Sequence, residues 1–350
     1  MRSDSELIRS GSEVECQVAA VRDQDRDTNE DEMRILNIGS INIDHVYKVD
    51  HFVRAGETIG GLSYSVFAGG KGFNQSIALA RAGASTLHAG RVGEGASWLL
   101  QRLAQEGVDT THVTVGEAAT GHAIIQVTPD GENAIVLYGG ANQLLSEVDV
   151  ESALSSCSPG DYLLVQNETS CVAQAIQKAH DNGLRIVFNP APMTADVLSY
   201  PLECVDIFIL NETEAEGLTG KTDLADIIAS MRDRFPSSAA VLTLGSKGAI
   251  YFDASSVHQK SALLVDAVDT TAAGDTFIGF FLGELMLTGD PVKALTQGCH
   301  AAAICVTRAG ASDSIPLRKE LETIAVHQDS KAIISAIINM NSSPSIHSIA

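Results

Sequence analysis

A carboxylate stands at the point where a run of small residues leads into an apolar stretch. Residues 267–286 read AVDTTAAGDTFIGFFLGELM, and Ala272, Ala273 and Gly274 predict a tight turn before a helix that starts near Asp275. A helix N-terminus presents free N–H groups and a partial positive charge, so it binds anions such as phosphate. Asp275 therefore has two interpretations: a cap that stabilises the helix, or a general base that takes a proton from a hydroxyl attacking the bound anion.

A glycine-rich loop precedes a second predicted helix. Residues 67–76 read FAGGKGFNQS, with glycine at positions 69, 70 and 72. Glycine lets the backbone approach a polar ligand closely, and Lys71 and Asn74 would offer donors beside it. The loop is not a Walker A loop, in which Ser or Thr follows the lysine, because Gly72 follows Lys71. A plain strand-to-helix turn is the alternative interpretation.

Three further stretches carry polar groups at strand ends. Asn42 and Asp44 alternate with isoleucines and so project to one face of a strand, where they suit the hydroxyls of a polyol or simply meet water. The stretch NETEAEGLTG places acids in the first turn of a helix, which stabilises the helix or serves a metal near phosphates. Residues 243–248, TLGSKG, form a strand and a turn that could support a nucleotide base.

The elements that must position these residues alternate between strand and helix. Strands are expected at 34–47, 160–168, 185–192 and 204–210, in two pieces within 240–253, and in a segment that ends at Val268; helices are expected at 72–84, 96–108, 171–183, 211–220 and 290–310. Repeated strand–helix units predict a mostly parallel sheet covered by helices on both faces. Residues 57–68, read as short strands, and a hairpin at 121–142 interrupt this rhythm and predict a small β layer that covers the ligand-binding edge of the sheet.

Composition narrows the function classes. The chain has 350 residues, is 45% hydrophobic and carries a formal net charge of −21, which argues against a nucleic-acid partner. No apolar run reaches the roughly 20 residues that span a bilayer, so no membrane association is expected. The six cysteines form no C-x-x-C pair, which favours free thiols in a reducing, cytoplasmic location. Residues 1–32 hold ten acids against four arginines and predict a disordered acidic tail; residues 329–350 predict a C-terminal helix and a loose tail.

Taken in order, these motifs resemble one known family. From about residue 34 to residue 318, the chain resembles the ribokinase-type sugar kinases. The motifs that carry this resemblance are, in order, S-I-N-x-D, A-G-E-T, G-G-K-G-x-N-Q, N-P-A-P, N-E-T-E-A, T-L-G-S-K-G, D-T-x-A-A-G-D-T-F and V-T-R-A-G. The resemblance implies an α/β fold, with a central mostly parallel sheet flanked by helices and a small β-sheet lid. It implies a kinase domain over 33–328, a lid from about 46–68 and 118–142, and a homodimer formed through the lid.

The resemblance also implies roles for individual residues. Asp275 matches the catalytic base, and Ala272, Ala273 and Gly274 match its anion hole. The sugar-binding positions are matched by Asn42, Asp44, Gly70, Lys71, Asn74, Glu168 and Asp275. The nucleotide-binding positions are matched by Asn211, Thr243, Gly245, Lys247, Gly248, Gly274 and Cys299. Glu214 matches an indirect Mg²⁺ contact, and a monovalent-cation loop is matched by Asp269, Thr271, Cys305, Arg308, Gly310 and Ser314. Two departures stand out: Ala55 replaces the usual proline of the lid motif, and Cys299 occupies the position of an adenine-contacting histidine, with His300 one residue away.

The activity implied is ATP-dependent phosphorylation of the primary hydroxyl of a small sugar, with Mg²⁺ and K⁺ as cofactors and D-ribose as the expected substrate. Another furanose, a fructose-type sugar or a nucleoside is the alternative; for a nucleoside, Tyr64, Phe67 and Phe73 could form a base pocket. A non-catalytic sugar-binding regulator is a different-class alternative. A nicotinamide dehydrogenase is disfavoured, because the first strand is followed by a single glycine in IGSINID and not by G-x-G-x-x-G.

Overall fold

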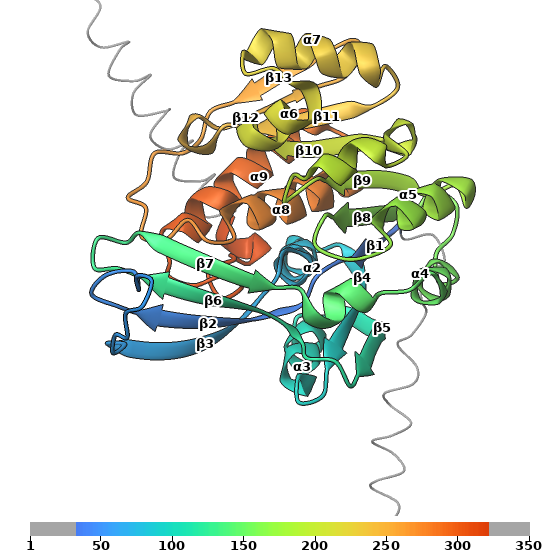
Figure 1. Cartoon of the computed structure of the whole chain (residues 1–350). Helices are drawn as coiled ribbons and strands as arrows, with labels where there is room; N and C mark the ends of the chain where they lie inside the picture. The colour runs from blue at the N-terminus through green and yellow to red at the C-terminus, as the bar shows by residue number, and fades with distance from the viewer. Residues whose placement is uncertain (1–32, 322–350) are drawn as a thin grey trace, which may run out of the picture. The chain divides into compact units, whose positions relative to one another are not determined.

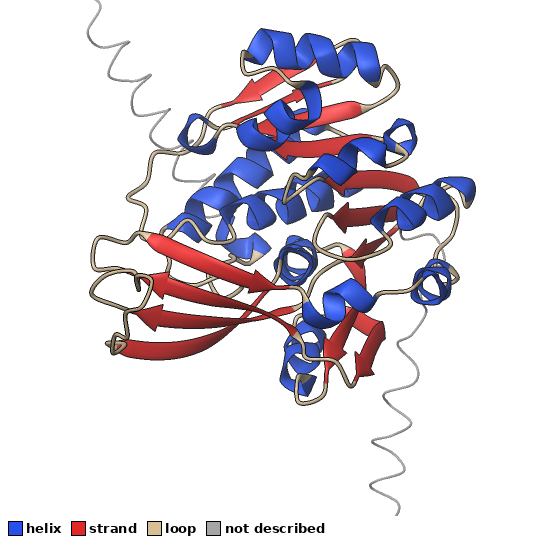
Figure 2. Ribbon diagram, viewed as in Figure 1, coloured by secondary structure: helices blue, strands red, loops and turns tan. Residues whose placement is uncertain are grey.

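The structure is a computed structural model that describes residues 33–321, and these form two β-sheets with helices around the larger one (Figures 1 and 2). The strands are β1 Arg34–Ile38, β2 Asn42–Lys48, β3 Ser63–Gly69, β4 Ser85–Gly93, β5 Asp109–Gly116, β6 Gly121–Val127, β7 Asn133–Tyr138, β8 Tyr162–Gln166, β9 Arg185–Asn189, β10 Ile207–Asn211, β11 Ala239–Thr243, β12 Ala249–Phe252 and β13 Val257–Lys260. The α-helices are α2 Lys71–Ala82, α3 Ser97–Gln105, α4 Glu147–Leu154, α5 Val172–Asp181, α6 Glu212–Thr219, α7 Leu224–Arg234, α8 Ala273–Thr288 and α9 Pro291–Val306. Short 3₁₀ helices are η1 Gly140–Leu144, η2 Ala195–Ser199, η3 Leu202–Cys204 and η4 Gly245–Lys247.

The larger sheet has nine strands in the order β13-β12-β11-β10-β9-β8-β1-β4-β5. All neighbours pair in parallel except β11 with β12 and β12 with β13. The chain builds β4 and β5 on one side of β1 and then continues with β8 on the other side. The strand order therefore reverses beside β1, and open sheets of this kind bind ligands at the carboxyl ends of the strands at such a point.

Alternate residues of the central strands pack against different helices. Leu36 and Ile38 of β1 belong to a core shared with α4, α5, α6 and α7, whereas Ile35 belongs to a core shared with α8 and α9. The α8 and α9 pair, orange to red in Figure 1, thus covers one face of the sheet, and α4 to α7 cover the other. A strand buried on both faces needs apolar residues throughout, which explains the near-continuous apolar runs of the sequence.

The smaller sheet, here called the lid, has the strand order β3-β2-β6-β7. β2 pairs with β3 antiparallel and with β6 parallel, and β6 and β7 form the hairpin expected around residues 129–131. β6 and β7 fall within the predicted lid segment 118–142, whereas β2 begins four residues before the predicted segment 46–68 and β3 ends one residue after it. Because β2 follows β1 after only three residues, the lid is joined directly to the carboxyl end of a central strand of the larger sheet.

Three details of the sequence-based expectation were wrong. The stretch 34–47 is not one strand but two, β1 and β2, which belong to different sheets. Residues 57–62 form no strand, and neither does the segment that ends at Val268. The expected tails, 1–32 and 329–350, and the last residues of the expected kinase domain lie outside the described residues. Between residues 33 and 321, no helix is long and apolar enough to cross a membrane.

Candidate active site

Asp275 is the third residue of α8, and its side chain does not cap the helix. The N-cap is Ala272, a non-glycine residue with φ of 59°, and no side chain caps this end. Instead, both carboxylate oxygens point to α2: Asn74 Nδ2 donates to Oδ2 at 3.0 Å, and Gln75 Nε2 donates to Oδ1 at 2.8 Å. Asp275 as a whole is 9% exposed. Of the two interpretations of Asp275, the cap is therefore wrong and the reactive carboxylate remains.

The start of α8 opens into a polar cavity of about 230 Å³. Ala272, Ala273, Gly274 and Asp275 line it, together with Lys71 from α2. The first N–H groups of a helix have no partner within the helix, so this end can receive an anion. The N–H of Ala273 already donates to the Thr270 carbonyl at 3.3 Å, which leaves the following residues of the turn to face the anion.

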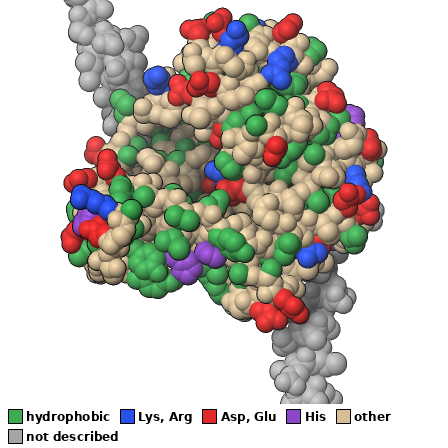
Figure 3. All heavy atoms as spheres, in the orientation of Figure 1, with side chains coloured by type: hydrophobic (Ala, Val, Ile, Leu, Met, Phe, Trp, Pro, Cys, Tyr) green, Lys and Arg blue, Asp and Glu red, His purple; other side chains and the backbone are tan. Residues whose placement is uncertain are grey.

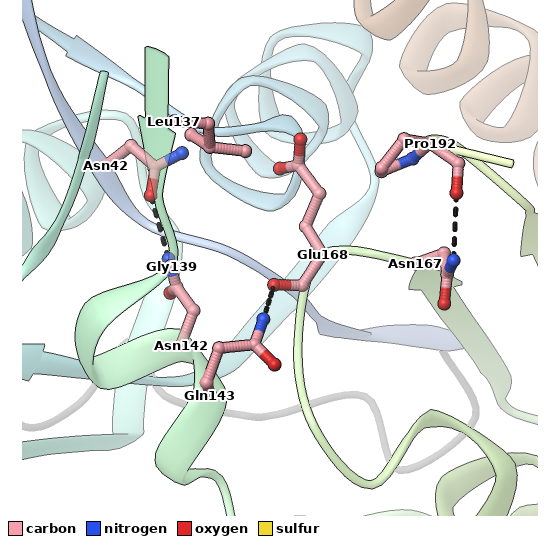
Figure 4. Close-up of a pocket in the computed structure, with 8 residues that line it drawn as sticks. All are labelled: Asn42, Leu137, Gly139, Asn142, Gln143, Asn167, Glu168 and Pro192. Carbon is pink, nitrogen blue, oxygen red and sulfur yellow. Dashed lines mark hydrogen bonds between the residues drawn. The ribbon is translucent and has the colours of Figure 1, made fainter. Parts of the chain in front are cut away.

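A second cavity, of about 250 Å³, lies between the lid and the core (Figure 4). Its lining residues are Asn42, Leu137, Gly139, Asn142, Gln143, Asn167, Glu168 and Pro192. Asn142 Nδ2 donates to Asn42 Oδ1 at 2.7 Å, and Gln143 Nε2 donates to the Glu168 carbonyl at 2.8 Å. The Glu168 carboxylate accepts the Ser40 hydroxyl and, at 3.2 Å, the N–H of Lys71. Polar groups held in this way can receive the hydroxyls of a sugar.

Asp44 lies on β2, two residues after Asn42, and its carboxylate packs over Gly69 of β3. A Cβ at Gly69 would stand 2.0 Å from Asp44 Oδ2, so only glycine leaves room for this carboxylate. Burial, and then the nearby charge of Glu168, raise the pKa of Asp44 to about 6. The carboxylates of Asp44 and Glu168 therefore lie close enough to repel each other.

Lys71 is the cation among the acids of the site. Burial alone would lower its pKa, but the negative charges of Asp275, Glu168 and Glu214 outweigh burial and raise it. Gly70, which precedes it, has φ of 95° and serves as the N-cap of α2, a conformation that favours glycine. The space-filling view shows the surface hollowed between the lid and the core, with acidic and basic side chains at the inner edge of the hollow (Figure 3).

A third cavity, of about 320 Å³, adjoins the polar one and is mostly apolar. The two share Thr243, Thr270, Ala273 and Gly274. Its other lining residues are Gly245, Ser246, Gly248, Ala262, Leu263, Leu264, Val265, Ala267, Phe277, Cys299, Ala302, Ala303 and Val306. A cavity lined in this way can receive a flat ring, and the adjoining polar cavity can receive an anion at the start of α8. Cys299 lines the cavity, whereas Lys247 is exposed and neither Lys247 nor His300 is among the lining residues.

Comparison with known proteins decides the family. A family-wide sequence profile, that of the pfkB family carbohydrate kinases, matches residues 33–318. The chain belongs to the pfkB family of carbohydrate kinases. It is an ATP-dependent sugar kinase with a ribokinase-like fold, as the order of its motifs implied.

Individual relatives of this pfkB kinase agree with that assignment. It is 42% identical over 294 residues to a ribokinase of Haemophilus influenzae, an alignment that covers 81% of this chain and 95% of the relative. It is 32% identical over 295 residues to a deoxyribokinase of Salmonella typhi, covering 81% of this chain and 96% of the relative. Among solved structures, the ribokinase of Cryptococcus neoformans in complex with ADP matches with a TM-score of 0.74 and 33% identity, over 83% of this chain and 99% of that one.

The remaining predicted residues of the kinase fall into two groups. Asn211 and Glu214 face the polar cavity from the start of α6 and form a reciprocal cap: Glu214 N donates to Asn211 Oδ1 at 2.8 Å, and Asn211 N donates to Glu214 Oε2 at 2.9 Å. Burial raises the pKa of Glu214, although the hydrogen bond from the Asn211 backbone and the positive charge of Lys71 act to lower it.

The second group consists of the residues that match the monovalent-cation loop, and it joins the turn before α8 to the loop after α9. Asp269 accepts the N–H of Thr271 at 2.9 Å and the N–H of Gly310 at 3.0 Å. Cys305 Sγ lies 3.0 Å from Ser314 Oγ and 3.7 Å from the Thr271 carbonyl. Arg308, in contrast, directs its guanidinium to Glu320 at 2.5 Å, so only its backbone is left for a cation.

Several residues of the site escaped the sequence analysis. Gln75 contacts Asp275, Asn142 holds Asn42, and Ser40 holds Glu168. Gln75 stands inside the G-G-K-G-x-N-Q motif, so the motif itself was the available signal. Asn142 had no such signal, because it reaches Asn42 across 100 residues of sequence.

Proposed function

We propose that this kinase transfers the terminal phosphoryl group of ATP to the primary hydroxyl of D-ribose and produces D-ribose 5-phosphate. The observation that carries the proposal is the place of Asp275, whose buried carboxylate lines the cavity that adjoins the apolar one. That polar cavity is linked to the sugar-side cavity through Lys71, whose backbone N–H donates to Glu168. The name of the relative with 42% identity, a ribokinase, supports ribose as the acceptor.

In the proposed mechanism, Asp275 is the general base. Its carboxylate accepts the proton of the primary hydroxyl while that oxygen forms a bond to the terminal phosphorus and the bond from phosphorus to ADP breaks. The N–H groups at the start of α8, with the Lys71 ammonium, stabilise the charge on the transferred group. A general base contributes about 10²–10⁴-fold to such a rate, and the electrostatic contribution is the larger one.

The sugar would be held by side chains that are already oriented. Asn42, Asp44 and Glu168 offer oxygens to sugar hydroxyls, and the backbone at Gly70 and Lys71 closes the site from α2. Asn74 Oδ1 is buried and has no hydrogen-bond partner within residues 33–321. A buried acceptor without a partner is costly, so a sugar hydroxyl that donates to Asn74 would be well bound.

Mg²⁺ would neutralise charge on the phosphates, and the start of α6 fits an indirect contact. Within the described range, no group of three or more His, Cys, Asp or Glu side chains could hold a metal ion. Both oxygens of Glu214 already accept hydrogen bonds, from Asn211 and Asn189. Mg²⁺ usually keeps several waters and binds substrate phosphates with one or two carboxylates. Asn211 and Glu214 therefore would hold it through its water.

We propose that K⁺ binds between the loop that holds Asp269 and Thr271 and the loop that holds Gly310, which the Asp269 carboxylate joins. The Asp269 carboxylate, the Ser314 hydroxyl and the carbonyls of the two loops would supply the several oxygens that a large monovalent cation binds. The ion would stiffen the turn from Asp269 to Asp275, where a displacement of about 1 Å can cost roughly 10²-fold in rate. Activity should rise with K⁺ at constant ionic strength, with Na⁺ a poor substitute and no response in Asp269→Ala. Equal rates in K⁺, Na⁺ and tetramethylammonium would contradict this site.

The outer face of the lid is proposed as a homodimer interface. Cross-strand pairing puts Tyr47, Tyr64, Ile124, Val136 and Tyr138 on one face, and the last two are 66% and 55% exposed. Exposed apolar patches of this kind mark interaction sites. Val136→Glu should convert a dimer into a monomer in light scattering; an unchanged mass would contradict the proposal.

A cytoplasmic location is also proposed for this kinase, supported by five described cysteines that are all free.

D-2-deoxyribose is a second candidate acceptor, because one relative with 32% identity is a deoxyribokinase. The test is kcat/KM with ATP and Mg²⁺ over D-ribose, 2-deoxy-D-ribose, D-fructose and adenosine. Ribose should lead the panel by at least tenfold. A higher value for any other member would replace ribose as the substrate, and no turnover of any would contradict the proposed function.

A further inference from the structure

Gln75, in α2, contacts the carboxylate of Asp275 and is fully buried. Its Nε2 donates to Asp275 Oδ1 at 2.8 Å and to Asn189 Oδ1 at 3.3 Å, and its Oε1 accepts Gln166 Nε2 at 2.7 Å. A glutamine amide has two N–H donors and one carbonyl acceptor group. All three are used here, by residues from α8, β9 and β8.

The partners of Gln75 are themselves anchored in the central sheet. Gln166, at the end of β8, also donates to Asn37 Oδ1 of β1 at 2.9 Å. Asn37 donates in turn to the Gly72 carbonyl and to Ser76 Oγ, both at 2.8 Å. Asn37 and Gln166 are no more than 1% exposed. A buried polar network of this kind is rigid when its bonds are made, since each broken bond leaves a desolvated group.

The close approach of α2 and α8 brings Gln75 within reach of Asp275. A Cβ at Gly279 would stand 2.3 Å from Ala78 Cβ, and a Cβ at Gly283 would stand 2.8 Å from Ala82 Cβ. Gly279 and Gly283 follow Asp275 at intervals of four residues, and Ala78 and Ala82 follow Asn74 at the same intervals. The two helices therefore run side by side in the same direction, and their first turns meet at Asp275.

We propose that Gln75 is a positioning residue for the phosphoryl transfer and acts through Asp275. Asn74 and Gln75 each hold one oxygen of the carboxylate, but the remaining amide oxygen of Asn74 has no partner within residues 33–321, whereas the Gln75 amide is bonded to β8 and β9 of the sheet. Gln75 thus fixes the rotation of the carboxylate relative to the sheet before any substrate binds. Displacement of a catalytic group by about 1 Å can cost roughly 10²-fold in rate.

This inference rests on the proposed role of Asp275 as the base, and a double-mutant cycle separates the two claims. Gln75→Met keeps the length of the side chain and removes the amide. Alone, it should lower kcat about tenfold or more and leave KM for ribose and for ATP within about twofold. In the Asp275→Ala background it should change the residual kcat by less than about twofold, because no carboxylate is left to position.

Two further variants complete the test. Gln297→Met makes the same change at a partly buried glutamine of α9 and should leave kcat unaltered. Gln166→Met removes the hydrogen bond that anchors Gln75 and should lower kcat by a smaller factor, about threefold, with the same dependence on Asp275. Thermal unfolding will show whether Gln75→Met folds. If Gln75→Met does not fold, Gln166→Met replaces it in the double-mutant cycle.

The contradicting results are distinct for the two claims. A factor of less than about two for Gln75→Met in the wild-type background, or an equal factor in both backgrounds, would overturn the positioning role. An Asp275→Ala variant that keeps more than about a tenth of kcat would instead overturn the base itself.

Discussion

The cavity next to the lid and the cavity next to α9 present different surfaces to a ligand. On the proposed sugar side, next to the lid, Asn42 and Glu168 offer side-chain oxygens, and each is held by a bond from another residue. On the proposed nucleotide side, next to α9, the lining consists mainly of glycines and small or aliphatic side chains. Under the proposed function, the sugar would be recognised by the identity of side chains, and the nucleotide base by the shape of the space that the backbone leaves. Substitutions should therefore act through lost hydrogen bonds on one side and through lost space on the other.

The largest effect is expected at Asp275, where the two sides meet. Asp275→Asn keeps the shape of the side chain and removes its ability to accept a proton. We expect kcat to fall by at least roughly 10²-fold, while calorimetry shows binding of sugar and ATP within a few-fold of wild type. A variant with more than about a tenth of wild-type kcat would remove Asp275 from the role of base.

Asp44→Asn tests the sugar side. The substitution should raise KM for ribose by about tenfold or more, through the loss of a charged hydrogen bond, and leave KM for ATP unchanged. A matching rise in KM for ATP would show that the two cavities are not independent.

The same variant should be more stable than wild type, with a defined pH dependence. A carboxyl whose pKa is raised on folding, here from 3.8 to about 6, stabilises the folded state below its unfolded pKa, and that contribution is lost as pH rises through about 6. Asp44→Asn should therefore raise the free energy of unfolding by up to about 2–3 kcal/mol at pH 8 and by little at pH 4. Urea titrations at both pH values measure the difference, and equal gains would contradict the assigned cause.

Gly248→Ala tests the nucleotide side. Gly248 has φ of 103°, and a Cβ there would stand 2.0 Å from the Lys260 carbonyl oxygen, so the loop that lines the base cavity must move. KM for ATP should rise about fivefold or more with KM for ribose unchanged, and strained backbone of this kind costs about 1–3 kcal/mol. Gly245→Ala is the matched control, because its φ of 55° is also positive but no atom lies within 4 Å of the added Cβ. Equal effects of the two variants would show that space is not the determinant.

The smallest effect is expected for removal of residues 1–32. They carry ten acids and show no pattern able to bury apolar surface. A chain that starts at Met33 should keep wild-type kcat and melting temperature. A clear loss of either on truncation would show that the acidic segment takes part in folding or catalysis.

The sequence predicted the parallel sheet because apolar runs and glycine-bounded helices are local signals. It also predicted the turn before Asp275 and the glycine loop before Lys71, since both depend on small residues that are adjacent in the chain. It did not show that residues 34–47 divide between two sheets, because both strands have strand-like residues and the change of sheet at Gly39 depends on tertiary packing.

The contacts that hold the site together are the part that the sequence could not supply. Asn142 reaches Asn42 across 100 residues of sequence, and Gln75 reaches Asp275 across 200. The bond from Gln75 depends on the distance between α2 and α8, which Ala78 and Gly279 set by being small. A single sequence does not reveal which small residues face each other.

The position of the new phosphate tests the central claim most directly. In ³¹P–¹H correlation spectra of the wild-type kinase with ATP, Mg²⁺ and D-ribose, we expect one phosphomonoester, coupled to the C5 protons. With 5-deoxy-D-ribose, which lacks the hydroxyl that Asp275 would deprotonate, we expect competitive binding and no transfer. Phosphate on C1, or transfer to 5-deoxy-D-ribose, would contradict the account of Asp275 as the base for the primary hydroxyl.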